Sequence, residues 1–456
     1  GTVDATANAT VVAGNDVTVT GAVEADATAS VTGAKNIAIE VGGKVNGADV
    51  AIEATAENAI IAGAVEATAN ATVVAGNDVT VTGAVEADNI LLKGGKDVSL
   101  ENTSTVKSGK NIRINAVDGD IKLGEGATVN SGENITILAD KGNIIQNTNI
   151  QADNGTIDVE AQAGNITMKS GVESITKNNN NIRYAARNEL TLANINAGNG
   201  GVLLDAESIN HLSGNTITAD RLAMRAGDKI GSETAEMNLS VSEISLEASG
   251  GVYIKNDRSA KVVSSDLSSD KFNVNRVNED FSTVLTPESA SASAKPIEGI
   301  VAENGNVSVE NSGDLVVETI IKAGEDVAVK IADGKLTVNG TVNAGDLAQL
   351  DVSQGRDVVF GAQGTVSASD VEVVAAGNIL DERSDLEVTS KGYATSMANS
   401  AAVTAKNSIT LIAEGNIGGD EYDYVTVDAP TLNASAAGDA AIAAGAGKNL
   451  NVSSIE

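Results

Sequence analysis

The sequence predicts an all-β fold: a single parallel β-helix, or solenoid, with about three short strands in each coil of about 20–24 residues. Two observations carry this prediction. Residues 5–26 and 67–88 are identical (ATANATVVAGNDVTVTGAVEAD), an offset of 62 residues. Within each repeat, apolar residues occupy alternate positions, which is the period of a half-buried strand and not that of a helix.

The offset of 62 residues divides into three shorter repeats. A Gly-x-Val motif recurs at steps of 20 to 22 residues, beginning at Gly1, Gly21, Gly43, Gly63 and Gly83. Repeats of this length are typical of solenoids. Leucine-rich and helical repeats fit less well, because neither a Leu/Asn consensus nor a period of 3.6 residues is present. We expect about 19 coils, and a coil spacing of about 4.8 Å then gives a rod about 90 Å long.

Three columns of apolar residues run through successive repeats and predict three strands in each coil. Each column advances by 21 to 23 residues: Val85, Val106, Val129 and Ile150; Ile90, Ile112, Ile135 and Ile157; Val98, Ile121, Ile144 and Ile166. These side chains are mostly β-branched, which suits a pleated, half-buried strand. Gly, Asn and Asp separate the strands and suit tight corners. A coil this thin leaves little room for large rings, in agreement with only 5 Tyr, 3 Phe and no Trp.

The alternation lapses between residues 258 and 300, and we expect this segment to leave the solenoid as a surface loop or hairpin. It contains clusters of Ser and Asp, two of the three prolines, and Phe272 and Phe281. The predicted organisation is a β-helix over 1–257, an excursion over 258–300 and a continuing β-helix over 301–456. Insertions in solenoids form loops on one face, so a partner site in the excursion is the alternative.

Composition disfavours most catalytic and nucleic-acid functions. The chain has no Cys and one His, which removes disulfides, thiolate metal sites and any site with two imidazoles. The few aromatic residues offer little stacking surface for bases or sugars. A net charge of −32, from 30 Lys and Arg against 62 Asp and Glu, disfavours nucleic acid and anionic membranes as partners. No stretch approaches the ~18 apolar residues of a membrane span, so we expect no membrane insertion by this segment.

No catalytic, cofactor-binding or metal site is predicted, and we expect no enzyme. The sequence lacks GxxxxGK[ST], GxSxG and HExxH motifs. The single histidine, His211, is interpreted as a surface or hydrogen-bonded polar residue, because no second imidazole or cysteine accompanies it.

One pair of carboxylates requires closer attention. Asp97 and Asp120 precede the third strand one coil apart, and a separation of ~5 Å is the one that retaining glycosidases use. The same column continues as Asn143 and Asn165, which favours a corner ladder in which each side chain bonds its own backbone. A weak calcium site at the acidic corner 118–120 is a further alternative.

The motifs at two places in the chain resemble those of the large repetitive adhesins of the filamentous-haemagglutinin type. They are AGDKIGSE at 226–233 with SLEASGGVYI at 245–254, and AEGNIG at 413–418 with ASAAGDAAI at 434–442, together with recurrent Gly-x-Asn-Ile-x-Ile strands. The resemblance implies a right-handed parallel β-helix shaft, secretion by the two-partner (type V) route, and a location on the cell surface of a Gram-negative bacterium. It also implies a role in adhesion or biofilm structure.

These observations favour a non-enzymatic extracellular rod that spaces or presents adhesive regions. Its expected partner is a component of a host or bacterial cell surface or of the extracellular matrix. The pattern is already under way at Gly1 and persists at Val452, so we expect a segment of a longer protein. The alternative is a self-assembling filament or surface-layer subunit that stacks end to end, because unpaired terminal strands are templates for pairing.

Overall fold

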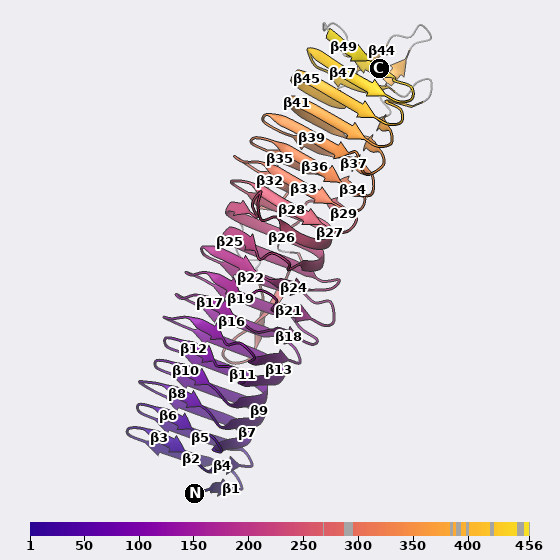
Figure 1. The fold of residues 1–456 in the computed structure, drawn as a ribbon. Helices are drawn as coiled ribbons and strands as arrows, with labels where there is room; N and C mark the ends of the chain where they lie inside the picture. The colour runs from indigo at the N-terminus through magenta and orange to yellow at the C-terminus, as the bar shows by residue number, and fades with distance from the viewer. Residues whose placement is uncertain are drawn as a thin grey trace. The chain divides into compact units, whose positions relative to one another are not determined.

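The computed structural model of the chain describes residues 1–267, 269–286, 295–383, 386–388, 394–397, 401–419, 424–444 and 451–455. They form two compact units, Gly1–Ala219 with Leu267–Ala294, and Asp220–Asp266 with Lys295–Glu456. Both consist of short parallel strands stacked coil upon coil (Figure 1). The prediction of an all-β parallel solenoid is therefore confirmed, with about 20 turns in all.

In the first unit the strands form three columns, and each strand pairs in parallel with its equivalent in the next coil. The first column contains β1 (Val3–Ala5), β4 (Ala22–Ala25), β15 (Thr128–Ser131), β18 (Ile150–Ala152), β21 (Glu173–Thr176) and β24 (Asn194–Asn196). The second contains β2 (Ala9–Ala13), β5 (Thr28–Gly33), β16 (Ile135–Ala139), β19 (Ile157–Ala161) and β22 (Ile182–Ala186). The third contains β3 (Val17–Val19), β6 (Ile37–Ile39), β8 (Ala59–Ile61), β10 (Val79–Val81), β12 (Val98–Leu100), β14 (Ile121–Leu123), β17 (Ile144–Gln146), β20 (Ile166–Met168) and β23 (Glu189–Leu192).

Several long strands pass through a corner without a break and so belong to two columns. β7 (Lys44–Ala54), β9 (Ala64–Ala75), β11 (Ala84–Gly94) and β13 (Thr105–Ala116) join the first column to the second, and β25 (Gly201–His211) joins the second to the third. β26 (Ile217–Ile230) begins in the first unit and ends in the second. The strands thus follow the three predicted columns. In some coils, however, two of the three strands merge into one, because the corner between them needs no turn residue.

The predicted apolar columns are confirmed in their register. Val85 aligns with Val106, Ile112 with Ile135, and Ile121 with Ile144, and the other predicted neighbours pair in the same way. All of these side chains are fully buried. The Gly-x-Val repeat has a steric cause, because a Cβ atom on Gly63 or Gly83 would overlap the carbonyl oxygen of the glycine one coil earlier.

Among the described residues, the core of the coils holds two fully buried aromatic rings, in keeping with the little room expected in so thin a coil. Tyr184 and Phe360 are both fully buried. The Tyr184 hydroxyl lies 2.7 Å from Gln146 Oε1 and 2.6 Å from Ser174 Oγ, so polar neighbours inside the coil satisfy it. Burial raises the pKa of the Tyr184 phenol.

The second unit repeats the architecture of the first. Its solenoid strands, after the end of β26, are β27 (Met237–Ala248), β28 (Val252–Asn256), β29 (Ala260–Val262), β32 (Gly299–Ala302), β33 (Val307–Asn311), β34 (Leu315–Val317), β35 (Ile320–Ala323), β36 (Val327–Ile331), β37 (Leu336–Val338), β38 (Thr341–Asn343), β39 (Leu347–Val352), β40 (Val358–Phe360), β41 (Thr365–Ala375), β42 (Ile379–Asp381), β45 (Val403–Ala413), β46 (Val425–Asp428), β47 (Thr431–Ala436), β48 (Ile442–Ala444) and β49 (Asn451–Ile455). A short antiparallel hairpin of β43 (Leu386–Val388) and β44 (Ala394–Met397) accompanies them.

The long excursion folds as a second antiparallel hairpin, β30 (Val274–Val277) with β31 (Thr283–Thr286). Within the predicted segment 258–300, β29 still pairs with β27 and β34, and β32 with β35. Pro287 and residues 289–294 lie outside the described residues. The hairpin belongs to the first unit, and Phe272, Val274 and Val277 are almost fully buried. It is a hairpin, one of the two forms that the sequence predicted, and these three side chains show that it packs against the coils.

Candidate functional site

The column of Asp97, Asp120, Asn143 and Asn165 forms a ladder of hydrogen bonds along one corner. Asp97 Oδ1 accepts from the Asp120 amide N–H at 2.7 Å, and Asp120 Oδ1 accepts from the Asn143 amide at 2.7 Å. Asn143 Oδ1 accepts from the Asn165 amide at 2.9 Å. Each side chain thus satisfies the backbone of the next coil, whereas the sequence predicted a bond to its own backbone. The geometry ties successive coils together and commits one oxygen of each acid to that task.

The other candidate residues are also held in structural contacts. His211 is buried, its Nε2 lies 3.2 Å from the Ala193 carbonyl oxygen, and burial lowers the pKa of its imidazole. Asp118 pairs with Lys141 at 2.5 Å. Among the described residues, no three side chains of His, Asp or Glu gather in an arrangement suited to a metal ion. In the same part of the chain no helix is long and apolar enough to cross a membrane.

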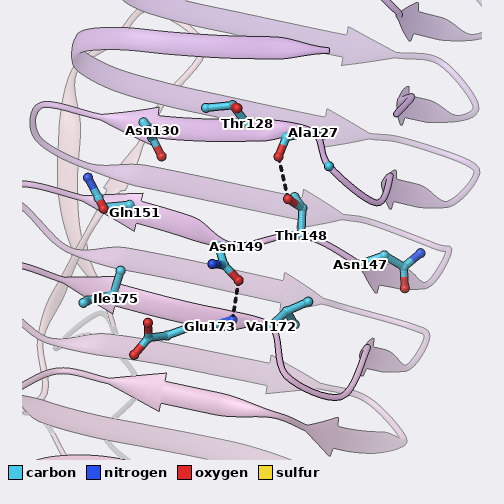
Figure 2. Close-up of a pocket in the computed structure, with 11 residues that line it drawn as sticks. Ala127, Thr128, Asn130, Asn147, Thr148, Asn149, Gln151, Val172, Glu173 and Ile175 are labelled. Carbon is cyan, nitrogen blue, oxygen red and sulfur yellow. Dashed lines mark hydrogen bonds between the residues drawn. The ribbon is translucent and has the colours of Figure 1, made fainter. Parts of the chain in front are cut away.

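A polar hollow of about 500 Å³ opens beside the first strand column, at β15, β18 and β21. Figure 2 shows the outward side chains Asn130, Gln151 and Ile175 one above another on these strands. The turn before β18 supplies Asn147 and Asn149. Asn149 Oδ1 accepts from the Glu173 amide at 2.8 Å, which holds this wall to the next coil.

A second hollow of about 500 Å³ lies on the same column, a few coils nearer the N-terminus. Its strand residues Asn46, Glu66, Glu86 and Lys107 align in register, and Lys107 in turn aligns with Asn130 of the first hollow. One outward column therefore lines both hollows. This surface is not among the residues predicted from the sequence, because the apolar columns mark only the inward positions. The available signal is the polar residue between each pair of buried ones.

The chemistry of this column is that of hydrogen bonding and charge. Amides and the carboxylate of Glu173 line the first hollow, and three carboxylates with one ammonium group line the second. Equivalent positions recur once per coil, at a spacing of about 4.8 Å. A linear ligand that lies along the column would meet one set of donors and acceptors in each coil.

A different polar cluster is buried beneath the hairpin. Arg183 Nη1 lies 2.7 Å from Asp158 Oδ1 and 2.9 Å from Glu160 Oε2, and Arg276 Nε lies 2.7 Å from Asp158 Oδ2. Burial by itself raises the pKa of the Asp158 carboxyl, but the charges and hydrogen bonds of Arg183 and Arg276 outweigh it and hold that pKa below its ordinary value of 3.8. Burial opposes the charged form of Arg183 too, yet Asp158 and Glu160 raise the pKa of its guanidinium. The two acids and two guanidiniums compensate one another in charge.

Comparison of the chain with models of protein families, with curated proteins and with solved structures found no match. The fold and the described contacts are therefore the basis of the functional argument.

Proposed function

We propose that this chain is a non-enzymatic structural shaft of an extracellular bacterial adhesin, on the surface of a Gram-negative cell. In that role it spaces or presents adhesive regions in attachment and biofilm formation. The observation that carries the proposal is the repetition of one coil through both units, with an interior almost wholly of stacked aliphatic side chains. Repeated coils that contact only their neighbours are suited to gaining length rather than to enclosing a reaction site.

Charge supports an extracellular shaft. A net charge of −32 over 456 residues keeps such chains soluble and apart from one another. The partner proposed for the shaft is a component of a host or bacterial cell surface or of the extracellular matrix. The column that lines the two hollows offers it amide and charged groups at regular spacing.

The absence of catalysis is part of the proposal. Its strongest competitor is a glycan hydrolase that uses Asp97 and Asp120, one coil apart in the corner ladder. Turnover of an acidic polysaccharide that Asp120→Asn abolishes would revive that competitor. We expect no turnover by either form, because one oxygen of each carboxylate is committed to a backbone amide.

Electron microscopy of the purified chain at neutral pH tests the shaft. We expect separate rods, whose length follows from about 20 turns at about 4.8 Å each. Indefinite fibres would instead support the filament or surface-layer alternative, in which coils of different molecules pair end to end. Labelled antibody against the chain on intact cells is the companion measurement, and a signal confined to the cytoplasm would overturn the surface assignment.

A further inference from the structure

The hairpin β30–β31 lies across several coils of the first unit and forms a hydrogen bond or an ion pair with each of them. Glu279 pairs with Lys93 of β11 at 2.7 Å, and the Val277 carbonyl accepts from Arg113 of β13 at 2.6 Å. The Val277 amide donates to Thr136 Oγ1 of β16 at 2.8 Å. Further along the hairpin segment, Arg276 pairs with Asp158 and Glu160 of β19, and the Asn273 carbonyl accepts from Asn181, just before β22, at 2.8 Å.

These contacts involve five successive coils. Strand β11 pairs with β13, β13 with β16, β16 with β19, and β19 with β22. A coil of a solenoid ordinarily contacts only the coils before and after it, so an end that is pulled peels away one coil at a time. The hairpin adds bonds from one element to coils that are not neighbours, such as those of β11 and β22.

The surface beneath the hairpin is built for this contact. In the first coils the outward positions of the second column are small and at least partly exposed, as at Thr10, Ser30 and Thr72. Beneath the hairpin the outward positions of this column are buried, except for Arg183, which is half-buried. These positions are Leu91, Arg113, Thr136, Asp158, Arg183 and Leu203. The hairpin contributes Val274 and Val277, each with 0% of its surface exposed. Apolar contacts and a compensated ion cluster thus share one interface.

We propose that the hairpin β30–β31 is a mechanical clamp, which makes the coils of β11, β13, β16, β19 and β22 yield to tension as one body. This inference gives the proposed shaft a means to bear load, and rests on that function only for its biological use. The clamp itself is a property of the purified chain, so it can be tested separately from any surface location.

The test is optical-trap extension of the full chain, held by handles at its two ends. In the unaltered chain we expect residues 93–183 to be released in one step, which for about 90 residues is roughly 300 Å of extension. In Arg276→Ala, the acids of β19 lose their hairpin partner. Loss of this buried ion pair should release the hairpin, and the single step should then divide into successive steps of one coil each. Lys255→Ala is the matched control, because the Lys255–Glu310 pair is exposed and belongs to the second unit, whereas the hairpin belongs to the first.

A milder variant covers the case in which Arg276→Ala fails to fold. Glu279→Gln removes the ion pair with Lys93, at the outermost coil. We expect the β11 coil to separate first and the remaining coils to leave together, in a step shorter by roughly 70 Å for about 20 residues. Coil-by-coil release of 93–183 in the unaltered chain, or step sizes that neither variant changes, would overturn the clamp.

Discussion

At the scale of single residues, the inward side chains decide whether a coil stacks. Ile135 is fully buried between Ile112 and Ile157, the equivalent residues of the neighbouring coils. An aspartate there would place an unpaired charge among aliphatic groups. In the first coils, away from the hairpin contacts, the outward positions of the same column carry no such constraint, and Val12 in β2 is 70% exposed.

We expect Ile135→Asp to lower the free energy of unfolding by about 4 kcal/mol. Val12→Asp, the matched outward control, should change it by less than about 0.5 kcal/mol. Urea unfolding followed by circular dichroism measures both. Equal midpoints for Ile135→Asp and the unaltered chain would contradict the assignment of Ile135 to the core.

The inward residues could be predicted from sequence because their chemistry repeats. The columns that begin at Val85, Ile90 and Val98 were identified to the residue, since each coil imposes the same apolar requirement about 22 positions later. The partners of the corner ladder could not. A side chain such as Asn143 can bond its own turn or the next coil, and only the stacking distance selects the second.

At the scale of elements, the docking of the hairpin on the coils could not be predicted from the sequence. The lapse of alternation marked a departure from the coils, and Phe272 lies within it. Nothing local indicates that the segment returns to a surface formed more than a hundred residues earlier. Asp158 and Arg276 are 118 residues apart, and nothing in the sequence distinguishes either of them from an ordinary surface charge. Long-range pairing of this kind is visible only once the fold places them together.

The depressed pKa of Asp158 gives the docked hairpin a defined pH dependence. A carboxyl whose pKa is lowered by folding contributes stability that is complete above its ordinary value of 3.8 and is lost as pH falls below that value. We therefore expect the hairpin to remain docked from pH 7 to pH 5 and to be released only in stronger acid.

A fluorophore measures this release. The chain has no cysteine, so Leu285→Cys, at a side chain 55% exposed on β31, provides a single labelling site. Fluorescence anisotropy should stay constant to pH 5 and fall below about pH 3.8. In the same labelled chain, Asp158→Asn removes the titrating carboxylate and should lower anisotropy already at pH 7. Release between pH 5 and pH 6 would show that another group governs docking.

At the scale of the whole molecule, composition and fold have one explanation. A narrow coil selects Val, Ile, Leu and Ala for its interior and leaves most of the acidic residues to the surface. Rings enter only where neighbours make room or satisfy their polar atoms, as at Tyr184. The same distribution concentrates the net charge of −32 on the outside, where it governs how copies of the chain meet.

Repulsion between copies should therefore control association. At pH 7 and low salt we expect a single sedimenting species, because each molecule carries a large charge of one sign. Near the isoelectric point of about 4.3 that repulsion vanishes, and reversible association should follow. This pH lies above the range in which Asp158 releases the hairpin, so association there reports surface charge and not loss of the clamp.

Sedimentation velocity at pH 7, with and without added salt, is the control, since salt screens charge without removing it. Fibres that form at pH 7 in low salt, where repulsion is strongest, would show that end-to-end pairing exceeds it and would favour the filament over the separate shaft.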